Sequence, residues 1–127
     1  MQEEEKFIKA GYEYQLTLTH LLEDATKLYP KQEIVYRDKV RYNYAEYYKR
    51  CQRLSNALES LGVGLNTRVG TLEWNTHRHF EMYFAIPCMG AILHPINPYL
   101  PPIQLTYIIN HAEDKVLLLN CLLYTSP

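Results

Sequence analysis

Three basic or titratable side chains stand together where a helix is expected to begin. His77, Arg78 and His79 follow Asn75, which has the residue type of a helix N-cap. Cations at this end oppose the helix dipole by about 0.3–1 kcal/mol each when charged. Such departures from local preference are more common at functional sites, so the cluster is a candidate binding site. The alternative, favoured by the local features alone, is that Arg78 and one His face solvent while the other His is a neutral, hydrogen-bonded core residue.

The sequence contains no pattern typical of a metal centre or a phosphate loop. His77 and His79 are two residues apart, so on a helix they point to nearly opposite sides and are not placed to chelate one ion. Cys51, Cys88 and Cys121 are far apart without a C-x-x-C pair, which argues against zinc and disulfide frameworks. G-x-G-x-x-G and G-x-x-x-x-G-K-[ST] motifs are both absent. We therefore assign no catalytic residue and no metal ligand.

The first half of the chain is predicted to form two helices around a hairpin. Apolar spacing indicates a helix over 19–29, ended by Pro30. The run "EIVYRDKVRYNY" predicts a tight hairpin around Asp38 and Lys39. A longer helix is expected over 44–61, with Gly62 as its left-handed C-cap. Its apolar stripe is predicted to contain Tyr48, Cys51, Leu54, Leu58 and Leu61.

The second half alternates between strand and helix. Strands are expected at 67–75, 91–97 and 115–120, and helices at 76–89 and 101–110. Two βαβ units imply an α/β fold with a parallel sheet and flanking helices. Pro101 suits a first helical turn, whereas Pro87 predicts a kink or an early helix end near Ile86.

Ligands of open α/β sheets bind beyond the carboxyl ends of the strands. Trp74 and Asn75 stand where the first of these strands ends, and Asn97 stands where the second ends. The helix that carries His77, Arg78 and His79 also begins at this edge. The carboxyl edge is therefore the expected place for a ligand.

Composition narrows the classes of protein and partner. The chain has 127 residues, 47% of them apolar and 21% charged, with a net charge of -1. These values are typical of one soluble globular domain, and no basic stripe predicts nucleic-acid binding. No apolar run reaches the roughly 18 residues that a transmembrane helix needs. The opening "MQEEEK" differs from a signal peptide, so we expect a cytoplasmic location, while an organellar or membrane-peripheral one stays open.

Five phrases, taken in order, resemble the acyl-adenylate-forming enzymes (the AMP-dependent synthetase and ligase family). They are "YNYAE", "LESLGV", "RVGTLEWNTHRH", "MGAILHPINPYL" and "NHAEDKVL", and the resemblance runs from about Leu16 to Asn120. Medium- and long-chain fatty acyl-CoA ligases are the most similar group. One phrase alone would be weak, but five in sequence form a specific pattern.

The resemblance implies a two-step ligase. A carboxylic acid such as a fatty acid reacts with ATP, with Mg²⁺ as cofactor, to give an acyl-adenylate and pyrophosphate. Coenzyme A then displaces AMP. The family's Gly-rich phosphate loop, its adenine- and ribose-binding segments and its catalytic lysine would follow this sequence, so we expect an inactive fragment. A homodimer is an assembly that the resemblance allows for the longer enzyme.

The resemblance also divides the chain. Residues 1–15 would be a polar lead, 16–120 part of the N-terminal AMP-binding domain, and 121–127 a truncated or foreign tail, since "CLLYTSP" follows a finished strand without a turn. Tyr99 stands where the family commonly has Arg, and Cys88 where it commonly has Gly. The first difference removes a cation from the ligand edge.

The family resemblance suggests a role for the carboxyl edge. It would help to wall the acyl and coenzyme A side of the cleft rather than perform the adenylation. The residues predicted to line this wall are Trp74, Asn75, His77, Arg78, His79 and Asn97. Two other classes compete with the ligase: a stand-alone nucleotide- or coenzyme-A-binding module without chemistry, and a regulatory protein that binds a ligase through its sheet edge.

Overall fold

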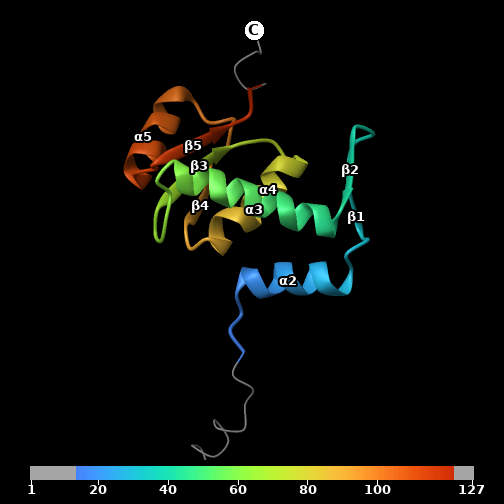
Figure 1. The fold of residues 1–127 in the computed structure, drawn as a ribbon. Coiled ribbons are helices and arrows are strands. Elements are labelled where there is room, and N and C mark those ends of the chain that lie inside the picture. The colour runs from blue at the N-terminus through green and yellow to red at the C-terminus, as the bar shows by residue number, and fades with distance from the viewer. Residues whose placement is uncertain (1–13, 122–127) are drawn as a thin grey trace, which may run out of the picture.

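The computed structural model describes residues 14–121. Its helices and strands alternate along the second half of the chain, as Figure 1 shows. In order, the elements are α2 (Leu18–Leu28), β1 (Glu33–Tyr36), β2 (Val40–Asn43), α3 (Tyr44–Ser60), β3 (Arg68–Leu72), α4 (His77–Cys88), β4 (Ile92–Pro95), α5 (Pro102–Ala112) and β5 (Val116–Leu119). None of the helices in this part of the chain is long and apolar enough to cross a membrane.

The predicted α/β class is confirmed. The strands β4, β3 and β5 form a parallel sheet in that order, and β1 and β2 form a separate antiparallel hairpin. Val69 of β3 is paired with Leu93 of β4 on one side and with Val116 of β5 on the other. Because the two crossovers run in opposite directions along the sheet, right-handed connections place α4 and α5 on opposite faces.

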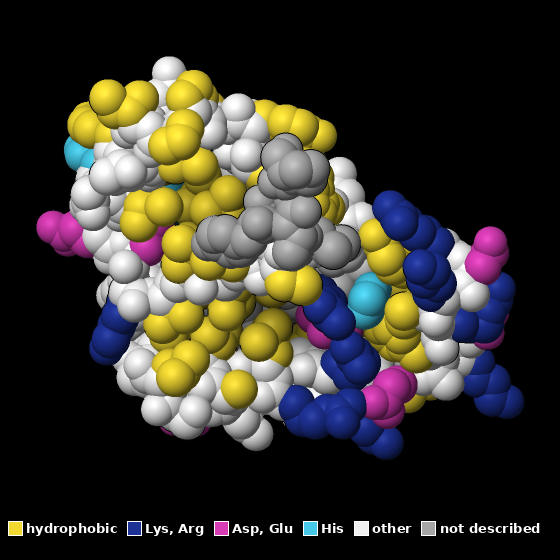
Figure 2. All heavy atoms as spheres, turned by 90° about the horizontal axis from the view of Figure 1, so that it is seen from above, with side chains coloured by type: hydrophobic (Ala, Val, Ile, Leu, Met, Phe, Trp, Pro, Cys, Tyr) yellow, Lys and Arg dark blue, Asp and Glu magenta, His cyan; other side chains and the backbone are white. Residues whose placement is uncertain are grey.

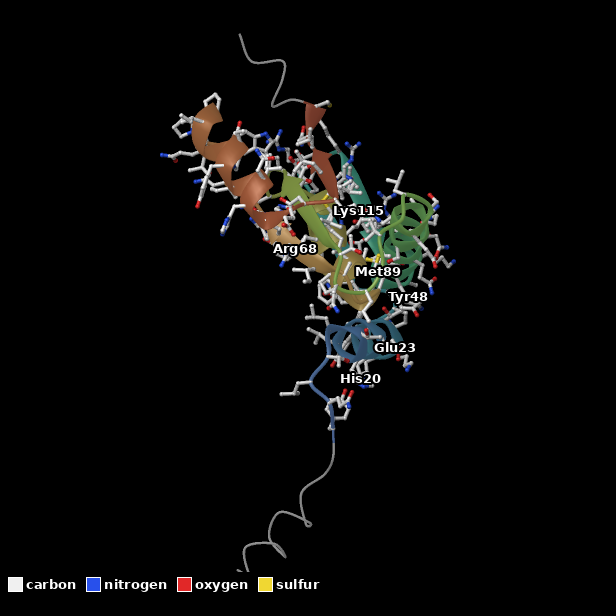
Figure 3. All side chains as sticks on the ribbon, turned by 90° about the vertical axis from the view of Figure 1, so that its left-hand side faces the viewer. His20, Glu23, Tyr48, Arg68, Met89 and Lys115 are labelled. Carbon is white, nitrogen blue, oxygen red and sulfur yellow. The ribbon has the colours of Figure 1, made fainter. Side chains whose placement is uncertain are left out.

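The core lies between the sheet and the layer of α3 and α4. One buried cluster joins the sheet to these two helices and contains Leu58, Val63, Val69, Met82, Ile86 and Ala91. A second cluster joins α2 to α3 and α4 and contains Leu22, Tyr47, Cys51 and Ala85. A groove of about 400 Å³ remains between these three helices. Tyr48 and Met89, which line it, lie above α2 in Figure 3.

The buried stripe of α3 differs from the predicted one at two positions. Cys51 and Leu58 are buried and Leu54 and Tyr48 are half-buried, but Leu61 is 61% exposed. Leu61 is the C-cap, where the chain leaves the helix and turns at Gly62 (φ 81°), so its side chain no longer follows the helical stripe. Tyr47 is buried instead, because α4 packs over that side of α3.

The start of α4 corrects the predicted cap. The N-cap is Thr76 rather than Asn75, and its Oγ1 accepts a hydrogen bond of 3.3 Å from the backbone N–H of His79. The far end also differs, because α4 continues past Ile86 to Cys88. Pro87 is accommodated one residue before the helix ends, where Gly90 (φ 84°) turns the chain toward β4.

The other boundaries move by a few residues. Pro101 is the N-cap of α5, and Pro102 is its first residue. The helix ends at Ala112, two residues beyond the predicted end, and Glu113 follows in the left-handed conformation (φ 56°). The three parallel strands are shorter than expected, so Glu73, Trp74 and Asn120 lie beyond the strands rather than within them. Of the predicted tail, 122–127 fall outside the described residues, as do 1–13 of the polar lead.

Candidate functional site at the carboxyl edge of the sheet

Two aromatic rings meet where β3 and β4 end. Trp74, two residues after β3, lies with its ring centroid 5.2 Å from that of Tyr99, four residues after β4. Asn97 holds the second of these loops, because its Oδ1 accepts a hydrogen bond of 3.0 Å from the backbone N–H of Tyr99. Trp74 is half-buried and Tyr99 is exposed. Two predicted residues, Trp74 and Asn97, are thus brought to one place.

A buried polar pair joins the ends of β3 and β5. Asn120 donates a hydrogen bond from its side-chain amide to Oε1 of Glu73, and both side chains are buried. The same Glu73 oxygen accepts a hydrogen bond of 3.0 Å from the backbone N–H of Trp74. The backbone N–H of Asn120 donates to the carbonyl of Leu72 at 2.9 Å. Contacts therefore run sideways along the carboxyl edge, from Asn120 through Glu73 and Trp74 to Tyr99.

His79 faces the sheet beneath this edge. Its Nε2 lies 3.2 Å from Oγ1 of Thr71 on β3, and both residues are buried. Burial lowers the pKa of the His79 imidazole, although the Glu73 carboxylate acts in the opposite direction. The ring is therefore neutral at pH 7 and does not oppose the dipole of α4.

His77 and Arg78, the other two residues of the basic cluster, do not face the sheet. The His77 ring lies against the hairpin, with centroids 5.3 Å from Tyr36 and 6.3 Å from Tyr42. Burial lowers the pKa of His77 as well, although Glu81 raises it. Arg78 is exposed. The alternative interpretation of the cluster is thus largely correct, with His79 as the neutral core residue, except that His77 packs against tyrosines rather than facing solvent.

A polar network fixes the position of the hairpin against α3 and α4. Glu81 of α4 is buried and forms an ion pair of 2.5 Å with Arg50 of α3. Tyr42 of β2 donates a hydrogen bond of 2.8 Å to the same Glu81 oxygen. The Arg50 guanidinium also lies over the Tyr42 ring, 5.1 Å from its centroid. This network explains why His77, one turn before Glu81, is directed toward the hairpin.

Glu73, Asn120 and Thr71 were not predicted to be members of this edge. The one available signal was the position of Glu73 and Asn120, each a polar residue placed directly after an apolar strand. Asn75 was a predicted wall residue, and its side chain is exposed.

Lys and Arg side chains gather toward the hairpin side of the face seen in Figure 2, whereas hydrophobic side chains predominate toward α5 and the sheet.

The described residues contain no ready-made cluster of metal ligands. Between residues 14 and 121, no group of three or more His, Cys, Asp or Glu side chains is placed to hold a metal ion. The sequence also lacks a Gly-rich phosphate loop of either common type. We therefore derive no phosphoryl-transfer step from these residues. What the edge offers is an aromatic surface, Trp74 and Tyr99, held by buried polar contacts.

Comparison with known proteins decides the family. The sequence profile described as "AMP-binding enzyme" matches residues 22–125. The chain belongs to the AMP-binding enzyme family. The Thermus thermophilus long-chain-fatty-acid–CoA ligase is 49% identical over 110 residues, covering 84% of this chain and 20% of that protein. The medium-chain-fatty-acid–CoA ligase of Ectopseudomonas oleovorans is 38% identical over 110 residues, with the same coverage of both chains. The chain therefore spans about a fifth of the length of these relatives.

Solved structures agree with the assignment of the AMP-binding fold. A putative long-chain-fatty-acid CoA ligase from Rhodopseudomonas palustris is 26% identical and superposes with a TM-score of 0.77, over 84% of this chain and 27% of that one. The N-terminal domain of FACL13 from Mycobacterium tuberculosis is 21% identical and has a TM-score of 0.80, again over 84% of this chain. The second likeness concerns the fold alone.

Proposed function

We propose that this chain contributes the first part of an ATP-dependent fatty acyl-CoA ligase. The reaction would convert a carboxylic acid, ATP and coenzyme A into acyl-CoA, AMP and pyrophosphate, with Mg²⁺ as cofactor. The observation that carries the proposal is the 49% identity to a long-chain-fatty-acid–CoA ligase along 84% of this chain. The other fatty-acid ligase relative and the shared fold support it.

We assign residues 16–120 to the N-terminal AMP-binding domain, with 1–15 as a polar lead and 121–127 as a segment outside that domain. The carboxyl edge would line the acyl and coenzyme A side of the cleft. Trp74 and Asn97 are the predicted wall residues that the structure brings together, through Tyr99. His77 and His79 would support this wall from the hairpin and the sheet, and Arg78 and Asn75 would lie on its solvent side. The enzyme would act in the cytoplasm, and a homodimer is its proposed assembly.

The 127 residues alone are proposed to be inactive. In phosphoryl and acyl transfer, preorganised charges around the reacting groups usually carry the largest share of catalysis. The described residues hold no cluster for the metal ion, and the sequence lacks the phosphate loop. The chain would therefore contribute fold and pocket wall.

A chimaera tests the proposal. Residues 16–120 would replace the matching segment of the Thermus thermophilus relative, and acyl-CoA formation from palmitate, ATP and coenzyme A would be measured. We expect a folded enzyme with a rate within about tenfold of the parent, because the exchanged segment keeps the same fold and nearly half of the residues. A folded chimaera that forms neither acyl-adenylate nor acyl-CoA would contradict the ligase proposal and favour a binding or regulatory module.

A further inference from the structure

Both rings of the Trp74–Tyr99 pair lie on loops that follow strands. Trp74 is only half-buried, and Tyr99 is 80% exposed. Neither loop is part of a strand, and the backbone of Trp74 is not paired in the sheet. Two rings in such loops need a further anchor if they are to present a fixed surface to a ligand.

Glu73 supplies that anchor. Its side chain is 6% exposed although it lies beyond the last residue of β3. One carboxylate oxygen, Oε1, accepts hydrogen bonds from both the backbone N–H of Trp74 and the side-chain amide of Asn120. A carboxyl group is seldom buried without such donors, because losing its hydration is costly. Its position is therefore set from two sides.

The anchor is itself tied into the sheet. Asn120 is 9% exposed and follows β5, and its backbone N–H extends the parallel pairing by donating to Leu72 at 2.9 Å. The Asn120 side chain reaches Glu73 from this fixed backbone position. The sheet thus fixes the backbone of Asn120, and the Asn120 side chain donates a hydrogen bond to Glu73. Glu73 in turn accepts a hydrogen bond from the backbone N–H of Trp74.

We propose that Glu73 is a positioning residue that sets the Trp74–Tyr99 pair as an apolar wall for the hydrocarbon part of the acid. This inference rests on the proposed ligase function. Tyr99 would be the residue that favours an apolar chain at this edge, since its ring covers Trp74 and brings no charge. Glu73 itself would not touch the acid, because its side chain is buried and its Oε1 accepts the hydrogen bonds from Asn120 and Trp74.

The first test uses the 127-residue chain, in which Trp74 is the sole tryptophan. Glu73→Ala is expected to shift Trp74 emission to longer wavelength and to lower its fluorescence anisotropy, because the backbone N–H loses its acceptor. Glu73→Gln keeps an acceptor oxygen and is expected to restore both signals. Glu59→Ala, at an exposed position on α3, is the matched control. Unchanged Trp74 signals in a folded Glu73→Ala chain would overturn the positioning role.

The second test measures selectivity in the chimaera. We expect Glu73→Ala to lower the palmitate-to-octanoate ratio of kcat/KM about tenfold, the effect of losing contact with one or two methylene groups. The KM for ATP should not change, and Glu73→Gln should recover the ratio. If Glu73 only stabilised the fold, Glu73→Ala would lower the unfolding temperature and leave the palmitate-to-octanoate ratio unchanged. That result would overturn the inference.

Two further outcomes are distinguishable. If Glu73→Ala does not fold, Tyr99→Ala removes the exposed ring and leaves the buried Glu73–Asn120 pair intact. An unchanged selectivity ratio in that variant would overturn the proposal that the Trp74–Tyr99 pair is an apolar wall. If the unsubstituted chimaera folds but makes no acyl-CoA, the ligase proposal fails first. An active chimaera whose Glu73→Ala and Tyr99→Ala variants keep the parent ratio would refute the positioning inference alone.

Discussion

The imidazole of His79 lies with its Nε2 3.2 Å from Oγ1 of Thr71, and both side chains are buried between α4 and the sheet. This contact decides how the basic cluster at the start of α4 is accommodated. The ring is kept neutral by burial, so the helix begins with one exposed cation, Arg78, rather than three. The unfavourable charge pattern of the sequence is largely removed by folding.

The two histidines predict a pH dependence of stability. Burial lowers the pKa of His77 and of His79 in the folded chain, so below pH 6.5 the unfolded chain binds more protons than the folded one. The free energy of unfolding should therefore be at its full value about one pH unit above 6.5, and it should fall as the pH drops through 6.5 toward the folded-state pKa values. The slope has a ceiling of about 1.4 kcal/mol per pH unit for each histidine. Urea unfolding at pH 7.5, 6.5 and 5.5 measures how the free energy of unfolding depends on pH.

His79→Gln provides the control for this effect. Glutamine retains polar atoms near Thr71 but does not titrate, so this variant should lose part of the dependence below pH 6.5. An equal slope in the parent and His79→Gln would show that His79 does not titrate on unfolding.

The ion pair between α3 and α4 is predicted to matter more than a surface pair. Arg50→Ala leaves the buried Glu81 carboxylate with Tyr42 as its remaining partner in the network. We expect a loss of about 2 kcal/mol, below the 3–5 kcal/mol of fully buried pairs, because Arg50 is partly exposed. Arg53→Ala breaks the exposed pair with Glu46 and should cost less than about 1 kcal/mol. Denaturant unfolding compares the two, and equal losses would contradict the assigned role of the network.

Gly70, which lies within β3, is predicted not to tolerate a side chain. A Cβ at this position would lie 2.7 Å from Cδ1 of Leu117 and 2.8 Å from a carboxylate oxygen of Asp114. That oxygen is held by His94, whose Nδ1 lies 2.8 Å away, so it cannot move without breaking the pair. Gly70→Ala should cost about 1–3 kcal/mol through overpacking.

Gly64→Ala is the matched substitution for that test. Nothing lies within 4 Å of the Cβ it would add, and its φ is not in the left-handed region. We expect no loss, or a gain of about 0.4–1 kcal/mol from the reduced freedom of the unfolded chain. A comparable loss in both variants would mean that backbone conformation, rather than the crowding by Leu117 and Asp114, sets the cost at Gly70.

Local patterns were sufficient to predict the elements and the parallel sheet. Apolar periodicity, caps and turn residues identified every helix and strand of the described part within a few residues. The predicted burial of Leu61 was wrong because a chain that leaves a helix changes the direction of its side chains. The predicted cap at Asn75 was wrong because Thr and Asn are both good caps, and the helix begins after Thr76. These errors concern ends of elements, where one-residue differences redirect a side chain.

The candidate site could be predicted only in part. Trp74 and Asn97 were expected at one edge because they lie near the ends of neighbouring parallel strands. Glu73 and Asn120 were not, since they are separated by 47 residues and their pairing depends on the order of strands in the sheet. The direction of His77 depends on where the hairpin packs, which is fixed by Arg50 and Glu81 rather than by any local pattern.

The most direct test of the account is the KM for palmitate in the chimaera that carries Trp74→Ala. If the carboxyl edge walls the acyl pocket, this KM should rise about tenfold, the KM for ATP should stay at the parent value, and Arg53→Ala should change neither. A folded Trp74→Ala chimaera with the parent's KM for palmitate would contradict the claim that this edge contacts the acid.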